Sequence, residues 1–201
     1  MLTWHGLCSN FTWKLRFKSE KDECLLLIPL LLAGAYFAQA ARSLALSPAL
    51  PSNSETLVSE EHELTKDINS ERIQRGLNPL AFDPLLVRAA RAHSREMCSL
   101  NYFSHRSPLK AARMPMDRYL CALRAAGLPV PSSVMVGENL YYSSLFTPGD
   151  TVGMAKQALM DSPDHQAILL GRRFAKIGVG VYQDSSGQFW VTEMFLQDSD
   201  Q

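Results

Sequence analysis

The sequence predicts an α+β fold in which helices come first along the chain and a small antiparallel sheet follows. Between residues 57 and 97, apolar residues recur with the 3.6-residue period of helices. Farther on, Ile177, Val179 and Val181 alternate with small residues, and a turn at 184–187 precedes a second run that starts at Phe189. This pattern is typical of a β-hairpin. Because a hairpin must bury an apolar face, we expect it to pack against the helices.

The first helix is predicted after residue 56. Leu57, Leu64 and Ile68 share one helical face. Acidic residues come early in this segment and basic residues late, an order that suits the helix dipole. Gly76 follows as a suitable C-cap.

The second helix is predicted to begin at Asp83 and Pro84, which provide an N-cap and a first turn. Its apolar face consists of Leu86, Ala89, Ala90, His93 and Met97. Because His93 lies on this face, we expect it to be a hydrogen-bonded structural histidine.

Three further elements are predicted between residues 111 and 162. A third helix covers 111–126 and ends at Gly127, and a short strand covers 134–142. A fourth helix covers 151–160, and Ser162 with the proline after it stops this helix.

Composition indicates one globular domain without a dominant charge. The chain has 201 residues, 46% of them hydrophobic, and its 20 basic residues balance its 20 acidic residues. The hydrophobic content is sufficient for a core. A net charge of zero argues against a nucleic-acid partner, because the chain has no overall positive charge that would attract phosphates.

The N-terminal segment is typical of a secretory leader. Residues 25–38 are apolar apart from small interruptions, basic residues precede them, and Ala38-Gln39-Ala40 resembles a cleavage site. We therefore predict a signal peptide at 1–40, with a retained signal-anchor as the alternative. A flexible linker at 41–56, a domain at 57–197 and a tail at 198–201 follow. This organisation predicts a secreted, extracellular or periplasmic protein, with membrane contact only through the leader if it stays uncleaved.

Removal of the leader leaves two cysteines, Cys98 and Cys121. In an exported chain they could form one disulfide or remain as separate buried thiols, and their spacing is compatible with both.

Common catalytic motifs are missing from the sequence, which contains no HExxH, GxSxG, P-loop or Rossmann glycine pattern. Three ionisable residues instead stand at element ends: His105 in FSH, Glu138 in GENL and His165 in SPDH. Side chains at such positions can converge in a cleft. Taken singly, they are also compatible with ordinary surface residues.

An ordered series of short motifs resembles the CAP superfamily, which comprises cysteine-rich secretory, antigen-five and pathogenesis-related proteins. The resemblance is closest to the bacterial SCP-like extracellular branch and covers about residues 57–197. The motifs, in chain order, are NxxR from Asn69, GLxPL from Gly76, DxxL from Asp83, AAxxHS from Ala89, FSH, GENL, SPxH and IGVG from Ile177.

The resemblance implies an α-β-α sandwich, with helices on both sides of a three-stranded antiparallel sheet. It also implies a cavity with two histidines and two acidic residues, which in some members binds a divalent metal such as zinc. Matched by position, the ligands are His105, Glu138 and His165, and Ser162 takes the second acidic position. Two histidines and one carboxylate are the protein ligands of an open zinc site.

Two residues near these positions depart from the family pattern. Glu193 replaces a glutamine in the last strand, and we interpret it as a solvated glutamate rather than a replacement ligand. Asp164 replaces a glycine, and it could hold the ring of His165 or raise its pKa, because a nearby negative charge favours the protonated ring.

The resemblance favours a non-enzymatic protein that acts by binding, with a lipid, a glycan or a protein as partner. One alternative is a metal-dependent hydrolase of cell-envelope peptides or glycans, and a related hypothesis makes Ser162 a nucleophile activated by His165. Another alternative is a structural envelope protein in which the His/Glu cluster braces the helices against the sheet.

Overall fold

The structure is a computed structural model that describes residues 13–16, 53–144 and 151–197. The predicted leader, apart from 13–16, lies outside these residues, as do the first part of the linker and the C-terminal tail. No helix within the described ranges is long and apolar enough to cross a membrane.

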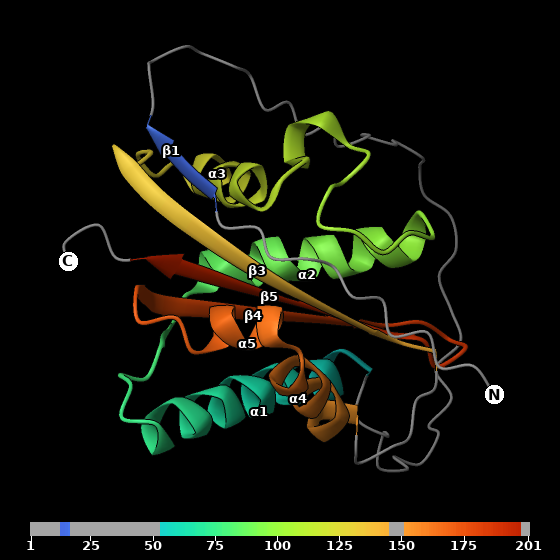
Figure 1. The fold of residues 1–201 in the computed structure, drawn as a ribbon. Coiled ribbons are helices and arrows are strands. Elements are labelled where there is room, and N and C mark those ends of the chain that lie inside the picture. Colours follow the sequence, from blue (N-terminus) through green and yellow to red (C-terminus); the bar gives the residue numbers. More distant parts are fainter. Residues whose placement is uncertain (1–12, 17–52, 145–150, 198–201) are drawn as a thin grey trace, which may run out of the picture.

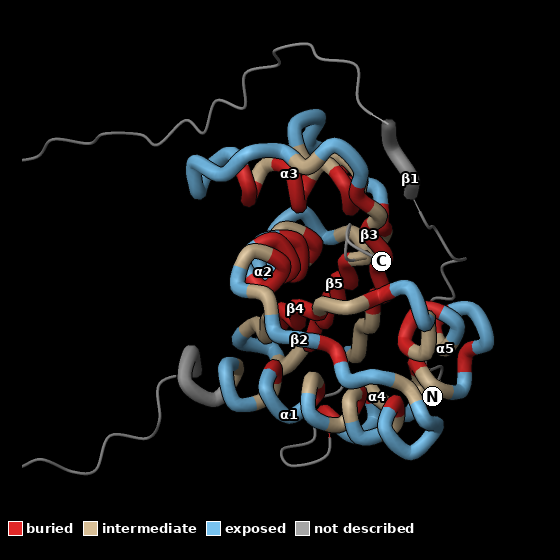
Figure 2. The backbone as a smooth tube through the Cα atoms, turned by 90° about the vertical axis from the view of Figure 1, so that its left-hand side faces the viewer, coloured by how far each residue is buried: buried red, intermediate tan, exposed pale blue. Residues whose placement is uncertain are grey.

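A central sheet lies between two layers of helices, as the family resemblance implies (Figure 1). One face of the sheet packs against α2 (Pro84–Ser99), which in turn packs against α3 (Pro115–Ala125). The other face is covered by α1 (Asn53–Gln74), α4 (Thr151–Asp161) and α5 (Pro163–Leu169). Buried residues concentrate between these layers (Figure 2). The predicted α-β-α sandwich is therefore confirmed.

The centre of the sheet consists of three long antiparallel strands, β3 (Ser133–Ser143), β5 (Phe189–Gln197) and β4 (Phe174–Gln183). The prediction of three strands omitted two short edge strands. The order is β1-β3-β5-β4-β2, in which β1 (Trp13–Arg16) is antiparallel to β3 and β2 (Ala81–Phe82) is parallel to β4. A two-residue strand is too short to show an alternating pattern, and β1 falls inside the predicted leader.

The ends of the first two helices are as predicted. Gly76 adopts a left-handed φ of 69°, and the Leu77 amide donates to the Arg72 carbonyl, which closes α1. The Asp83 side chain accepts from the amides of Leu85 and Leu86 at the start of α2. The helix α1 begins at Asn53, so four residues of the predicted linker belong to it.

Two predictions of helices need correction. The third helix begins at Pro115 rather than at residue 111, because proline lacks an amide hydrogen and is favoured in a first turn. Residues 110–112 form a separate 3-10 turn. The second correction is α5, which was not predicted: Ser162 both ends α4 and serves as the N-cap position of α5.

The two faces of the sheet have separate cores because consecutive strand residues point in opposite directions. In β3, Val136 packs in a cluster with residues of α2 and α3, whereas Tyr141 packs against a cluster that contains residues of α1 and α4. Glu138 and Asn139 are neighbours in this strand, so their side chains lie on opposite faces. This parity decides which candidate residues can meet.

Two motifs that carry the family resemblance have structural roles around α1. The Asn69 side chain bonds to both the amide and the carbonyl of Leu80. The buried Arg72 guanidinium donates to the carbonyls of Asn78, Leu169 and Gly171. These bonds hold the loop after α1 and the loop between α5 and β4 against the C-terminal part of α1.

The helix α2 lies directly on β4, and the glycines of the IGVG motif make this approach possible. A Cβ atom at Gly180 would lie 2.1 Å from the Arg91 nitrogen, and one at Gly178 would lie 2.3 Å from the Val87 nitrogen. Ser94 in α2 reinforces the contact, because its hydroxyl donates to the Gly180 carbonyl at 2.8 Å.

We therefore expect Gly180→Ala to destabilise the protein by about 3 kcal/mol or more, because α2 must move away from β4 to admit a methyl group. Chemical denaturation measures this loss. Gly127→Ala is the matched control: no atom lies within 4 Å of its Cβ position, so only its φ of 68° opposes the change, at a cost of about 1 kcal/mol. Equal losses in the two variants would contradict the packing argument.

Candidate functional site

His105 and Glu138 meet in one buried cluster, and Arg118 completes it. The His105 Nδ1 donates to Glu138 Oε1 over 2.9 Å. The Arg118 Nη2 lies 2.6 Å from Oε1 and 2.5 Å from Oε2 of the same carboxylate. Glu138 is in β3, His105 in the loop after α2, and Arg118 in α3. Three segments that are distant in sequence therefore meet at one carboxylate.

The charge of Arg118 keeps Glu138 ionised although its side chain is buried. Burial by itself would raise the pKa of Glu138, but Arg118, with smaller contributions from His93 and His105, lowers this pKa to about 2. Glu138 is only 1% exposed and Arg118 only 4%. The pair is thus a buried ion pair whose two charges depend on each other.

The loop that carries His105 is held by further buried hydrogen bonds. His93 Nε2 donates to the Ser104 carbonyl over 3.1 Å, which confirms that His93 is structural. Burial lowers the pKa of His93 to about 4, so its ring is neutral near pH 7. The Glu96 carboxylate accepts hydrogen bonds from the Tyr102 and Ser107 hydroxyls.

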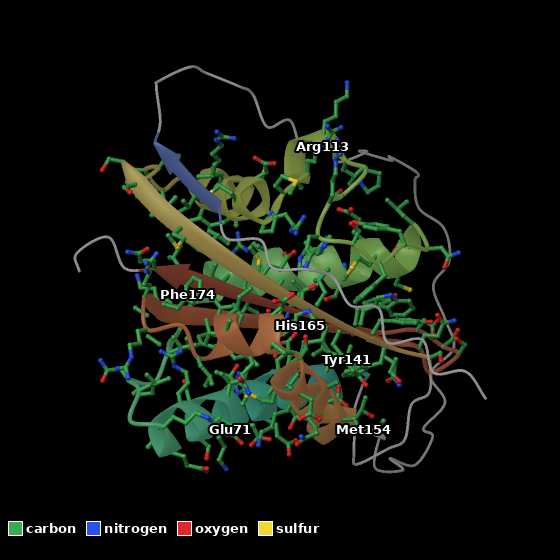
Figure 3. All side chains as sticks on the ribbon, viewed as in Figure 1. Glu71, Arg113, Tyr141, Met154, His165 and Phe174 are labelled. Carbon is green, nitrogen blue, oxygen red and sulfur yellow. The ribbon has the colours of Figure 1, made fainter. Side chains whose placement is uncertain are left out.

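His165, in α5, has hydrogen-bond partners other than Glu138. Its carbonyl accepts from Asn139 Nδ2 over 3.2 Å, and its Nδ1 lies 2.8 Å from the Ser162 hydroxyl oxygen. Asn139 points away from Glu138, because the two residues are consecutive in β3. In Figure 3, His165 lies on the α5 side of the sheet, and Arg113, near the start of α3, lies on the other side. The structure therefore bonds His105 to Glu138, whereas His165 bonds to Ser162 and Asn139 and lies near enough to His105 for that charge to act on its ring.

Electrostatics at His165 differ from the expectation. Burial, together with the nearby charge of His105, lowers the pKa of His165, although Asp164 acts in the raising direction. Asp164 thus acts in the expected direction, but desolvation of the buried ring exceeds its effect. His165 Nε2 is buried without a hydrogen-bond partner.

Glu193 is buried rather than solvated, which corrects the interpretation from the sequence. Its residue is 0% exposed, and Asn139 Nδ2 donates to its Oε2 over 3.2 Å. Burial raises the pKa of Glu193 to about 8, against the smaller opposing effect of Asn139. The carboxyl is therefore largely protonated near pH 7. Its central position in β5, between β3 and β4, explains its burial.

The predicted ligand set does not fit a metal ion in this arrangement. Among the residues that the structure describes, no group of three or more His, Cys, Asp or Glu side chains is arranged to hold one. Zinc sites in proteins use three or four protein ligands, whereas here Glu138 is already neutralised by Arg118 and His165 Nδ1 is bonded to Ser162. We therefore derive no metal-dependent step from these residues.

The Ser162–His165 pair has the spacing of a nucleophile and a base but lacks their surroundings. Ser162 is 8% exposed and His165 is 5% exposed, so a substrate has little access to either. A working pair also needs a third group that orients the imidazole, and the one bond shown for the His165 ring joins it to Ser162 itself. The Ser162–His165 contact is better explained as a hydrogen bond that stabilises the first turn of α5.

Cys98 and Cys121 are half-buried and are not joined by a disulfide in the structure. The Cys121 thiol donates to the Ala111 carbonyl over 3.2 Å. Of the two alternatives left by the sequence, separate thiols are the one observed.

The fold and this buried cluster define a CAP-type sandwich, and comparison with known proteins gives the family. The sequence profile of the cysteine-rich secretory protein (CAP) family matches residues 65–195. The chain belongs to this family, and the match lies within the predicted domain of 57–197.

Several bacterial relatives are similar to the chain. The uncharacterized protein YkwD of Bacillus subtilis is 33% identical over 136 residues, which cover 68% of this chain and 46% of YkwD. An extracellular SCP-domain protein from Bacillus anthracis has a TM-score of 0.58 at 25% identity, over 78% of this chain and 45% of that one. An outer surface protein of Borrelia burgdorferi has a TM-score of 0.57 at 18% identity, over 70% of this chain and 94% of the Borrelia chain. The chain thus spans about half the length of YkwD and of the Bacillus anthracis protein.

We expect Glu138→Gln to destabilise the protein by about 3–5 kcal/mol at pH 7, because it leaves the Arg118 charge buried without a counter-charge. Thermal and chemical unfolding without added metal measure this loss. The loss should decrease as pH falls from 4.5 towards 2, because protonation of Glu138 then removes the same ion pair from the wild type.

Glu71→Gln is the control for Glu138→Gln. Glu71 pairs with Arg75 and Lys156 near the surface, so its loss should cost below about 1 kcal/mol. A Glu138→Gln variant as stable as this control would contradict the conclusion that the buried Glu138–Arg118 ion pair stabilises the fold.

We expect Glu193→Gln to become more stable than the wild type as pH rises from 5 to 8. Between pH 4.5 and 8 the folded wild type retains a proton on Glu193 that the unfolded chain releases, so its stability falls through this window. The amide does not titrate, and at pH 7 the gain should approach about 3 kcal/mol. Denaturation of both proteins across this range measures the difference. A difference that does not change with pH would contradict a buried proton, and Glu63→Gln, at an exposed position of α1, is the control for the change of charge.

Proposed function

We propose that this chain is an exported CAP-domain protein that acts by binding a partner in the extracytoplasmic space. The proposal rests on one observation: the ionisable residues of the candidate site are bonded to other residues of the protein itself. Glu138 is occupied by Arg118 and His105, and His165 is occupied by Ser162. These groups stabilise the fold, which favours an outer surface as the functional part.

Two observations support an extracytoplasmic location. The Bacillus anthracis relative is described as extracellular, and the Borrelia protein, which shares the fold, is described as an outer surface protein. The apolar run at 25–38, with basic residues before it and Ala38-Gln39-Ala40 after it, is typical of an export signal.

An open groove on α1 is a suitable contact surface for such a partner. The groove has a volume of about 470 Å³ and is lined by Lys66, Asn69, Ser70, Ile73, Gln74 and Pro79. Ile73 is 59% exposed although it is apolar. A concave surface that combines an exposed aliphatic side chain with polar donors is typical of binding sites. We assign the partner contact to this groove.

The test is retention of the full chain on isolated cell envelopes of the producing bacterium. We expect the protein in the extracytoplasmic fraction and saturable retention on the envelopes. Lys66→Glu with Ile73→Asp should weaken retention at least tenfold, because the changes reverse a charge and remove apolar contact in the groove. His105→Ala should retain normal binding below its melting temperature.

The matched control is Leu109→Asp with Lys110→Glu, which makes similar changes at exposed positions near α3. Equal loss in both double variants would argue against the groove. A purely cytoplasmic location, or no saturable retention, would refute the proposed function. Release of soluble peptides or glycans that His105→Ala abolishes would instead favour the hydrolase alternative.

A further inference from the structure

The buried His/Glu cluster already contains a cation that belongs to the protein. Arg118 Nη2 lies within 2.6 Å of both Glu138 oxygens, so a single nitrogen bridges the carboxylate. The same nitrogen donates to the His105 carbonyl over 3.1 Å. Arg118 therefore occupies the position from which a bound cation would contact Glu138.

The guanidinium is held in this position by its other contacts. Arg118 Nη1 donates to the Ala112 carbonyl over 3.1 Å and lies 3.5 Å from the Arg113 carbonyl. Both carbonyls belong to the segment just before α3. Rotation of Arg118 away from Glu138 would break these bonds and leave two buried charges without partners, which is unfavourable.

The remaining ligand, His105, is also committed to the cluster. A carboxylate can only accept a hydrogen bond, so the His105 nitrogen that faces Glu138 must carry a hydrogen. That nitrogen cannot bind a metal in this state, because a metal ligand needs a free lone pair, so Nε2 is the one nitrogen of the His105 ring that could serve as a ligand. A divalent ion beside Glu138 would in addition be repelled by the adjacent guanidinium.

We propose that Arg118 is a built-in cation that takes the place of a divalent metal and keeps metal ions from the His105–Glu138 pair. Removal of the guanidinium would leave a buried carboxylate without a counter-charge, 2.9 Å from the His105 ring. Carboxylate oxygen and imidazole nitrogen are both ligands for zinc. Metal binding in this protein is thus suppressed by one residue of α3.

The test compares zinc binding to the wild type and to Arg118→Met, by calorimetry and by thermal unfolding with and without zinc. We expect Arg118→Met to bind zinc at least tenfold more tightly than the wild type, and zinc to restore part of its lost melting temperature. Cobalt, used as a spectroscopic probe, should give the variant a visible absorption band that the wild type lacks. Arg118→Met with Glu138→Gln should lose both effects.

Arg72→Met is the matched control, because Arg72 is also buried but its shown partners are backbone carbonyls. It should lose stability without any gain in zinc binding. If Arg118→Met does not fold without metal, folding on addition of zinc supports the proposal, and Arg118→Gln provides a second uncharged variant.

Two results would overturn the proposal. The first is stoichiometric zinc binding by the wild type that His105→Ala abolishes, since Arg118 would then not exclude the metal. This measurement does not depend on whether an Arg118 variant folds. The second is a folded Arg118→Met protein that binds zinc no better than Arg72→Met. Neither result bears on envelope retention, so the proposed binding function is tested separately.

Discussion

A carboxylate buried between a β-sheet and the helices on one of its faces is the constraint on which one half of this protein depends. Glu138 can stay ionised there only with a cation beside it, and Arg118 is that cation. To supply the guanidinium, α3 must lie against β3. The loop after α2 must also bring His105 next to Glu138, because the His105 ring donates a further hydrogen bond to this carboxylate. The position of the whole segment between α2 and β3 is therefore tied to the charge of one glutamate.

The helices, the hairpin and the layer arrangement were predictable because each has a strong local signal. Asp83 caps α2 in the structure as in the sequence, and Gly76 closes α1. The elements that were missed lack such a signal. The helix α5 has only seven residues and begins at the same Ser162 that ends α4, and β2 has only two. Short elements of this kind exist because of their tertiary contacts and not because of local preference.

The candidate site was predictable in part. The family resemblance selected His105, Glu138 and His165, and the structure bonds His105 to Glu138 while the His165 ring bonds to Ser162. Arg118 had a visible signal that was not used: it lies on the helical face of Ala122, where a charge needs a buried partner. Glu193 could not be placed, because nothing in its local sequence indicates that β5 is the central strand.

The alternation of Glu138 and Asn139 also checks the alignment of β3 with its neighbour. A slip of one residue would turn Glu138 towards the side of Glu193 and away from Arg118, while the amide of Asn139 would face the guanidinium. In such a misaligned sheet, Glu138 and Glu193 would lie on the same face without a basic residue between them. Arg118 would have no carboxylate partner. The polar residues of the sheet thereby disfavour misfolded states in which β3 is shifted by one residue. Apolar side chains would tolerate such a shift, because they can be buried on either face.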